Sequence, residues 1–126
     1  SSNATTFAQY GALAALEHWD DSLSAVQDML KHFDRRRIML LDGLNAISGI
    51  ECNRSEGAFY LFPRIKNLGM SSMEFADKLL EDKKVAVVPG EAFGTSGYMR
   101  LSYATSDDVI TEGLKRLDEF SANIKR

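Results

Sequence analysis

The chain has 126 residues, a length that corresponds to about one domain. Hydrophobic residues make up 44% of it and charged residues 26%, which are the proportions of a globular domain and not of a disordered tail. The formal net charge of −3 gives no bulk electrostatic basis for binding nucleic acid or an anionic membrane, so we expect neither partner.

The numbers of cysteines and histidines indicate the cellular compartment and exclude a structural zinc site. Cys52 is the single cysteine in the sequence and cannot form an internal disulfide, which suits a reducing, cytoplasmic location. One cysteine and two histidines cannot complete a structural zinc site, so we expect no metal. The apolar runs fall far short of the ~20 residues that span a bilayer, and no segment has the order of a signal peptide.

The first segment predicts a short helix over residues 7–16, with Thr5 or Thr6 as its N-cap. Ala8, Ala12 and Ala15 recur at helical spacing and give the helix a face of small residues, which suits close packing against another surface. The chain opens at Ser1 without an initiator methionine. We interpret it as a domain cut from a longer chain; a frayed terminus, or a tag remnant in the opening residues, is the alternative.

A long helix is predicted from Leu23 to about Ile47, after a break and cap at residues 20–22. The basic run at residues 35–37 is expected to be a solvated helix face, with the stem of Arg37 packed and its head in water. The predicted apolar seam of this helix alternates steps of four and three, is interrupted by Arg37, and comprises Val26, Leu30, Phe33, Leu40, Leu44 and Ile47.

The remaining elements alternate between strands and helices. Short strands are expected at residues 50–52 and 57–62, and a capping box at 71–74 precedes a helix over 73–82. Residues 85–88 form a continuous apolar run that predicts a strand buried on both faces, and residues 98–104 alternate as a second strand does. A final helix follows the cap at 105–108. The fold class is therefore α+β: one small, mostly antiparallel sheet of three to four strands with helices, one of them long, packed on one face. The helix over 73–82 is expected to bury Phe75, Ala76, Leu79 and Leu80, and the final helix Ile110, Leu114, Leu117 and Ile124.

Arg100 is the residue that the pattern itself singles out for binding. It is expected in the middle of a strand, after the glycine-rich loop 90–97 and on a face with Tyr98 and Ser102. A guanidinium held on a strand is a rigid donor fork for a carboxylate or a phosphate. The alternative is a solvated sheet arginine, paired for instance with Glu91.

Other candidate chemistry is weak. His18 and His32 are expected to be exposed on helices, and no serine lies in a nucleophile-elbow sequence. The glycines of loop 90–97 match neither a phosphate-binding loop nor a dinucleotide motif, so this loop is interpreted as a turn that needs positive φ. We therefore assign no catalytic, metal-binding or cofactor-binding residue to this chain.

Three segments, in order and at fitting spacing, resemble the C-terminal (small) domain of fold-type I pyridoxal-phosphate aminotransferases. In chain order they are Ser2–Ala12, Glu56–Phe62, and Pro89–Gly94 together with Tyr98–Ser106. The first of them resembles the segment where the large domain of that family continues into the small one. The closest similarity is to the bacterial aspartate aminotransferase group. Residues 1–126 are thus expected to form a single domain of a longer chain.

The resemblance implies roles for residues inside and outside this chain. It implies that Arg100 binds the substrate α-carboxylate, that the parent moves an amino group from an amino acid to a 2-oxo acid, and that it serves amino acid biosynthesis as a cytoplasmic homodimer. Pyridoxal 5'-phosphate, its Schiff-base lysine and its phosphate cradle belong to the missing large domain. Lys66, Lys78, Lys83, Lys84 and Lys115 are interpreted as solvated surface, so the isolated chain is expected to be inactive.

Two other functions stay open. One is a stand-alone α+β regulatory module that senses an acidic metabolite through Arg100. The other is a structural domain that docks through its alanine-rich first helix. Phe59 and the Phe93–Gly94 loop are expected either to line the closing face of the site or to serve as core and turn. The sequence leaves the substrate's side chain and the fragment's oligomeric state undetermined.

Overall fold

The computed structural model describes residues 2–65 and 68–124. The chain divides into two compact units, residues 1–32 and residues 33–126, and each is described by itself. The order of elements is two helices, a strand, a helix, two strands and a final helix, which matches the predicted order except that the strand expected at residues 50–52 is absent.

The first unit is helical. Helix α1 spans Thr6–Glu17, with Thr5 at its N-cap and His18 at its C-cap, and helix α2 spans Trp19–Ala46 and begins in this unit. The predicted break at residues 20–22 is wrong: the chain turns at His18, and Asp20 and Asp21 lie in the first turn of α2, where carboxylates are favourable against the helix dipole. No residue between 2 and 32 is buried.

The C-terminal half of α2 belongs to the second unit and supplies part of its core. Leu40 and Leu44 are buried, and so is Ile47 just beyond the helix, which confirms this part of the predicted seam. Val26 and Leu30 are exposed, so the seam does not continue into the first unit. Gly49 follows the helix end with φ 93°, a conformation that glycine adopts without steric cost.

Arg37 corrects a prediction about the same helix. Its head does not reach water: the side chain is buried, and its guanidinium donates to Asp34 at 2.5 and 3.1 Å and to the Ser55 carbonyl at 3.2 Å. The hydrogen bond to Asp34 is the main cause of a raised pKa at Arg37. A buried guanidinium needs such partners, since burial without them is costly.

Three short strands form one antiparallel sheet in the order β1-β3-β2. Strand β1 is Tyr60–Leu61, β2 is Val88–Pro89 and β3 is Met99–Ser102. The strands are shorter than predicted. Residues 50–52 contribute a single bridge from Glu51 to Arg64, and the turn before β1 holds Ala58 at φ 54°, outside the extended region.

The run at residues 85–88 is not buried on both faces. Val85, Val87 and Val88 are half-buried and Ala86 is exposed. The strand that continues this run, β2, lies at the edge of the sheet, so it has a hydrogen-bonded neighbour on one side within the described residues. An apolar sequence indicates that a segment can be buried, whereas its place in the sheet decides whether it is.

Helix α3 spans Ser72–Lys83 and helix α4 spans Asp107–Ile124. The predicted capping box is confirmed, because the Ser71 side chain accepts a hydrogen bond from the Glu74 amide at 3.2 Å. Leu80 is exposed, contrary to expectation, because it lies on the outer side of α3 while Phe75, Ala76 and Leu79 face the core. In α4, Ile110 and Leu117 are buried as predicted, and Leu114 and Ile124 are half-buried.

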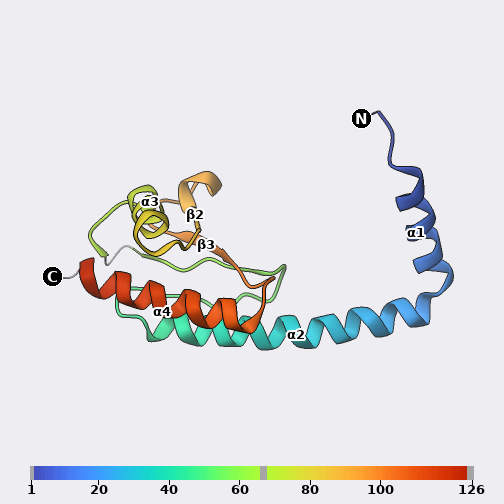
Figure 1. Cartoon of the computed structure of the whole chain (residues 1–126), viewed down its shortest axis with the longest axis horizontal. Coiled ribbons are helices and arrows are strands. Elements are labelled where there is room, and N and C mark those ends of the chain that lie inside the picture. The colour runs from blue at the N-terminus through green and yellow to red at the C-terminus, as the bar shows by residue number, and fades with distance from the viewer. Residues whose placement is uncertain (1, 66–67, 125–126) are drawn as a thin grey trace. The chain divides into compact units, whose positions relative to one another are not determined.

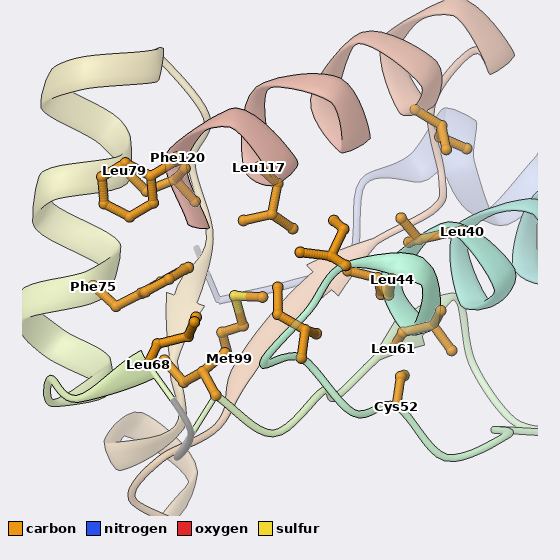
Figure 2. Packing of buried hydrophobic residues seen from close by; sticks show 14 of the residues in the cluster. Leu40, Leu44, Cys52, Leu61, Leu68, Phe75, Leu79, Met99, Leu117 and Phe120 are labelled. Atoms are coloured by element: carbon orange, nitrogen blue, oxygen red, sulfur yellow. The ribbon is translucent and has the colours of Figure 1, made fainter. Parts of the chain in front are cut away.

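The core lies where α2, α3, α4 and the sheet meet, and Figure 2 shows side chains from all of these elements converging on it. Figure 1 shows α4 lying along the C-terminal part of α2, an approach that Gly43 permits because a Cβ there would collide with Leu114. The predicted α+β class is confirmed.

Among the described residues, no helix combines the length and the apolar character that a membrane span requires. The core residues with the largest fully buried side chains include Leu44, Leu61, Ile65, Phe75, Leu79, Met99 and Leu117.

Candidate carboxylate-binding site

Arg100 lies in the middle of β3, the central strand of the sheet, opposite Val88 of β2. Alternation along the strand directs Met99 and Tyr103 into the core, and both are buried. Arg100 therefore points to the opposite face, where its side chain is partly exposed. The predicted strand position and face of Arg100 are both confirmed.

Two aromatic rings hold the head of Arg100. Its guanidinium carbon lies over the ring of Tyr60, 4.3 Å from the centroid, and over the ring of Phe93, 4.8 Å from the centroid. Both distances are well within the range of a cation–π interaction. Tyr60 is in β1 and Phe93 ends the 3-10 helix η2, Gly90–Phe93, which follows β2 directly.

Arg100 differs from the other arginines that the structure describes. Each of the others forms an ion pair with an aspartate or glutamate, whereas Arg100 has no carboxylate within ion-pair distance in residues 2–65 and 68–124. The suggested partner Glu91 instead accepts a hydrogen bond from Ser72 at 2.9 Å. The guanidinium thus keeps N–H donors available for an anion from outside the described chain. The paired arginines are Arg35 and Arg36 with Asp107, Arg37 with Asp34, Arg54 with Glu56, Arg64 with Glu51 and Arg116 with Glu112.

The glycine-rich loop beside Arg100 is anchored at both ends. Ser72, fully buried at the start of α3, donates to Glu91 and accepts a hydrogen bond from the Gly97 amide at 2.7 Å. A Cβ on Gly90 would collide with the carbonyl oxygens of Thr95 and Tyr98, so any side chain there would force the loop to shift. Gly94 and Gly97 have φ of 74° and 75°, which confirms the prediction of a loop that needs positive φ.

A small hollow opens in front of Arg100. Its volume is about 160 Å³, and it is lined by Tyr60, Arg100, Ser102 and residues 86–88. Pockets that enclose a small molecule usually measure roughly 300–1,000 Å³, so these residues form one wall of a site and not a complete one. A larger, mostly apolar hollow of about 470 Å³ lies between α4 and residues 84–86, and Arg100 does not line it.

The described residues do not fit a pyridoxal-phosphate site. Lys78 pairs with Glu74, Lys83 pairs with Glu119, and Lys84 donates to the Glu81 carbonyl, all at 2.7–2.8 Å. Lys115 is exposed on α4, and no described lysine lines the hollow beside Arg100. Lys66 lies outside the described residues. The expectation that this chain contributes no Schiff-base lysine stays a prediction.

Histidine and metal chemistry find no support in the described part of the chain. His18 and His32 are exposed, as predicted, and His32 lies 3.8 Å from Asp28. Residues 2–65 and 68–124 contain no group of three or more potential ligands that could hold a metal ion. Cys52 is buried, and burial raises the pKa of its thiol, which disfavours the reactive thiolate.

Sequence reasoning named Phe93 near the site but missed Tyr60. The signal was available in principle: Tyr60 pairs with Ser102, which lies two residues from Arg100 on the same face of β3. That register joins two segments that are far apart in the sequence and cannot be obtained from the alternation of either strand alone. Phe59, the other predicted aromatic, stacks on Phe33 and contacts the Tyr60 ring rather than Arg100.

Comparison with known proteins gives the family. The model of the family "Aminotransferase class I and II" matches residues 1–117, so the chain belongs to this family. It is 45% identical to an aspartate aminotransferase of Pyrococcus abyssi over 90% of this chain and 29% of the relative. It is 42% identical to an aspartate aminotransferase of Streptomyces avermitilis over 99% of this chain and 32% of the relative.

The solved structures agree with the sequence comparison. An aromatic aminotransferase from Pyrococcus horikoshii OT3 superposes with a TM-score of 0.89 at 41% identity, over 95% of this chain and 32% of that one. The chain therefore spans about a third of the length of the relatives it matches. The resemblance inferred from the three sequence segments is confirmed at the level of the family.

Proposed function

We propose that this chain is the C-terminal domain of a fold-type I aminotransferase and that Arg100 binds the α-carboxylate of the substrate. The observation that carries the proposal is the state of Arg100: it is fixed on the central strand and lies over two rings, without a carboxylate partner among the described residues. Membership of the aminotransferase family supports the same assignment.

The chemistry of this side chain suits the task. A guanidinium is planar and permanently charged, and it can donate two parallel hydrogen bonds to a carboxylate. Two bonds in one plane fix the orientation of a bound amino acid as well as its position, so the reacting carbon is held in a defined direction. A lysine could supply the charge but not this planar fork.

The remaining parts of the proposal concern the whole protein. Pyridoxal 5'-phosphate, which the family implies, supplies the electron sink for moving an amino group from an amino acid to a 2-oxo acid. Its binding residues lie outside this chain. We propose that the present domain closes over the substrate and excludes water, and that the parent works as a cytoplasmic homodimer in amino acid biosynthesis.

Kinetics of the full-length enzyme test the role of Arg100. Replacing Arg100 with Ala removes the charge-assisted hydrogen bonds to the carboxylate, so kcat/KM is expected to fall about 100-fold or more. Arg100→Lys should recover only part of the loss. Arg64→Ala is the matched control, because Arg64 is an exposed arginine paired with Glu51 in the same unit, and its removal should leave kcat/KM unchanged.

Two results would overturn the proposal. The first is an Arg100→Ala enzyme that folds normally and keeps its kcat/KM. The second is tight binding of a simple dicarboxylate such as succinate by the 126-residue chain alone, measured by calorimetry. The small hollow beside Arg100 predicts weak binding or none, since this chain provides only one wall of the site. Tight binding would favour the stand-alone regulatory module.

A further inference from the structure

The two rings around Arg100 have a function of their own. We propose that Tyr60 and Phe93 are positioning residues that hold the Arg100 guanidinium ready for the substrate carboxylate. This inference rests on the proposed function of Arg100 and deepens it. Neither ring needs to touch the substrate; each acts through the guanidinium, whose carbon lies 4.3 and 4.8 Å from the two ring centroids.

The sheet topology explains how the rings reach the same side chain. Strand β3 is central, with β1 on one side and β2 on the other. Tyr60 belongs to β1, and Phe93 belongs to η2, which begins at the residue after β2. One ring therefore comes from each side of the strand that carries Arg100. Two contacts from different elements restrict the movement of a long side chain more than one contact can.

A comparison with Arg37 shows why rings suit a binding arginine. Arg37 is immobilised by Asp34 and the Ser55 carbonyl; both accept hydrogen bonds from its N–H donors, and the Asp34 carboxylate also neutralises its charge. Arg100 is held by ring faces, which attract a cation through the quadrupole of the π system and accept no conventional N–H···O bond. The ring contacts hold Arg100 in place while leaving its charge and donors available to a ligand.

The rings are themselves supported. Phe93 meets Phe62 edge to face with centroids 5.9 Å apart, and Phe62 stacks on Tyr98 at 5.2 Å. Tyr60 contacts the Phe59 ring with centroids 4.6 Å apart. The start of η2 is fixed as well, because Glu91 accepts a hydrogen bond from buried Ser72. A positioning group is effective only when its own place is determined by its neighbours.

The test uses the full-length enzyme and two substrates: its preferred amino acid and the matching α-carboxamide, which lacks the carboxylate charge. The ratio of the two kcat/KM values reports how well the carboxylate is recognised. Removing one ring with Tyr60→Leu or Phe93→Leu should lower this ratio about tenfold, since one of the two cation–π contacts of the partly buried arginine is lost. Tyr60→Phe and Phe93→Tyr keep a ring and should retain the ratio within about twofold.

Control variants separate positioning from general damage. Phe33→Leu removes a ring in the same unit that contacts Phe59 and Tyr103 but not Arg100, so the ratio should stay at the wild-type value. Phe93 is 47% exposed, so Phe93→Leu is expected to fold and decides the question even if Tyr60→Leu does not. Circular dichroism and thermal melting check folding in each variant.

The outcomes distinguish the positioning role of the two rings from the proposed carboxylate-binding role of Arg100. Suppose that Arg100→Ala lowers the acid-to-amide ratio, whereas Phe93→Leu either reduces both kcat/KM values equally or reduces neither. The rings then have no positioning role, and the proposed function stands. If Arg100→Ala itself leaves the ratio unchanged, Arg100 is not the carboxylate anchor, and both proposals are wrong. A lower ratio in the leucine variants, with retention in the aromatic ones, supports both.

Discussion

The two units of this chain use similar side chains with opposite results. In the first unit, Phe7, Tyr10 and Leu16 are 80%, 69% and 65% exposed, and no residue between 2 and 32 is buried. In the second unit, Leu44, Leu61 and Phe75 are fully buried. The first unit consists of helices whose apolar side chains have no described partner within that unit. Apolar composition favours burial, but burial requires a second surface.

The largest contrast between the units should come from matched phenylalanine substitutions in the 126-residue chain. Phe75→Ala empties a fully buried site that packs against Phe120 with ring centroids 5.2 Å apart, and should cost about 3–5 kcal/mol of unfolding free energy. Phe7→Ala should change it by less than about 0.5 kcal/mol. Urea denaturation followed by fluorescence measures both. Equal losses would show that Phe7 is buried in solution and would remove the contrast.

A pair of glycine-to-alanine substitutions should change stability in opposite directions in the two units. Gly90→Ala places a Cβ against the Thr95 and Tyr98 carbonyl oxygens and should destabilise the second unit by about 1–3 kcal/mol. Gly11 lies inside α1, and a Cβ added there would meet no atom within 4 Å, so Gly11→Ala should favour helix by about 0.5–1 kcal/mol. Urea unfolding checks the first change and far-ultraviolet circular dichroism the second. A neutral Gly90→Ala would mean that the loop relaxes around the added methyl group.

The smallest effect is expected from surface carboxylates. Hydrogen bonding to Arg36 is the main cause that lowers the pKa of Asp107, and Arg35 adds to it. A depressed folded-state pKa stabilises the fold above the unfolded value of about 3.9 and loses this contribution as the pH falls through the folded value. Asp107→Asn should therefore lower the urea midpoint slightly at pH 7, and the gap to the wild type should narrow on acidification.

Asp28 in the first unit is the control for Asp107. Its contacts with Lys31 and His32 are 3.7 and 3.8 Å long and join exposed side chains, so Asp28→Asn should leave the midpoint at pH 7 unchanged. A gap between wild type and Asp107→Asn that stays constant from pH 7 to pH 3 would contradict the assignment of the stabilising contacts to the ionised carboxylate of Asp107.

The helices were the most predictable part of the fold. The capping box at Ser71 and Glu74 and most of the buried apolar positions of α3 and α4 depend on residues close in the sequence, and they appear in the structure; Leu80, which is exposed, is the exception in α3. The strands were less predictable. The run at residues 85–88 has a buried strand's composition, yet only Val88 lies in a strand, Ala86 is exposed and the three valines are half-buried, which depends on packing that local sequence does not encode.

The candidate site also has features that local sequence predicted and features that only the folded chain shows. Alternation placed Arg100 on the face opposite Met99 and Tyr103, and local sequence was sufficient for that. The sequence also singled out Arg100 for binding, but only the folded chain shows that Arg37 and Arg64 have carboxylate partners while Arg100 has none among the described residues. Tyr60 was missed because it lies 40 positions before Arg100 in the sequence.

The sequence by itself determined the α+β class, the positions of the helices, the family and the face of β3 that carries Arg100. Each of these follows from short-range periodicity or, for the family, from three local motifs that occur in order and at fitting spacing. Only the tertiary structure decided which apolar residues are buried, that Arg37 is buried and donates to the Ser55 carbonyl, and that two rings meet over Arg100. Those features depend on contacts between distant segments, whose energies are set by the geometry of packing and not by the identity of either residue alone.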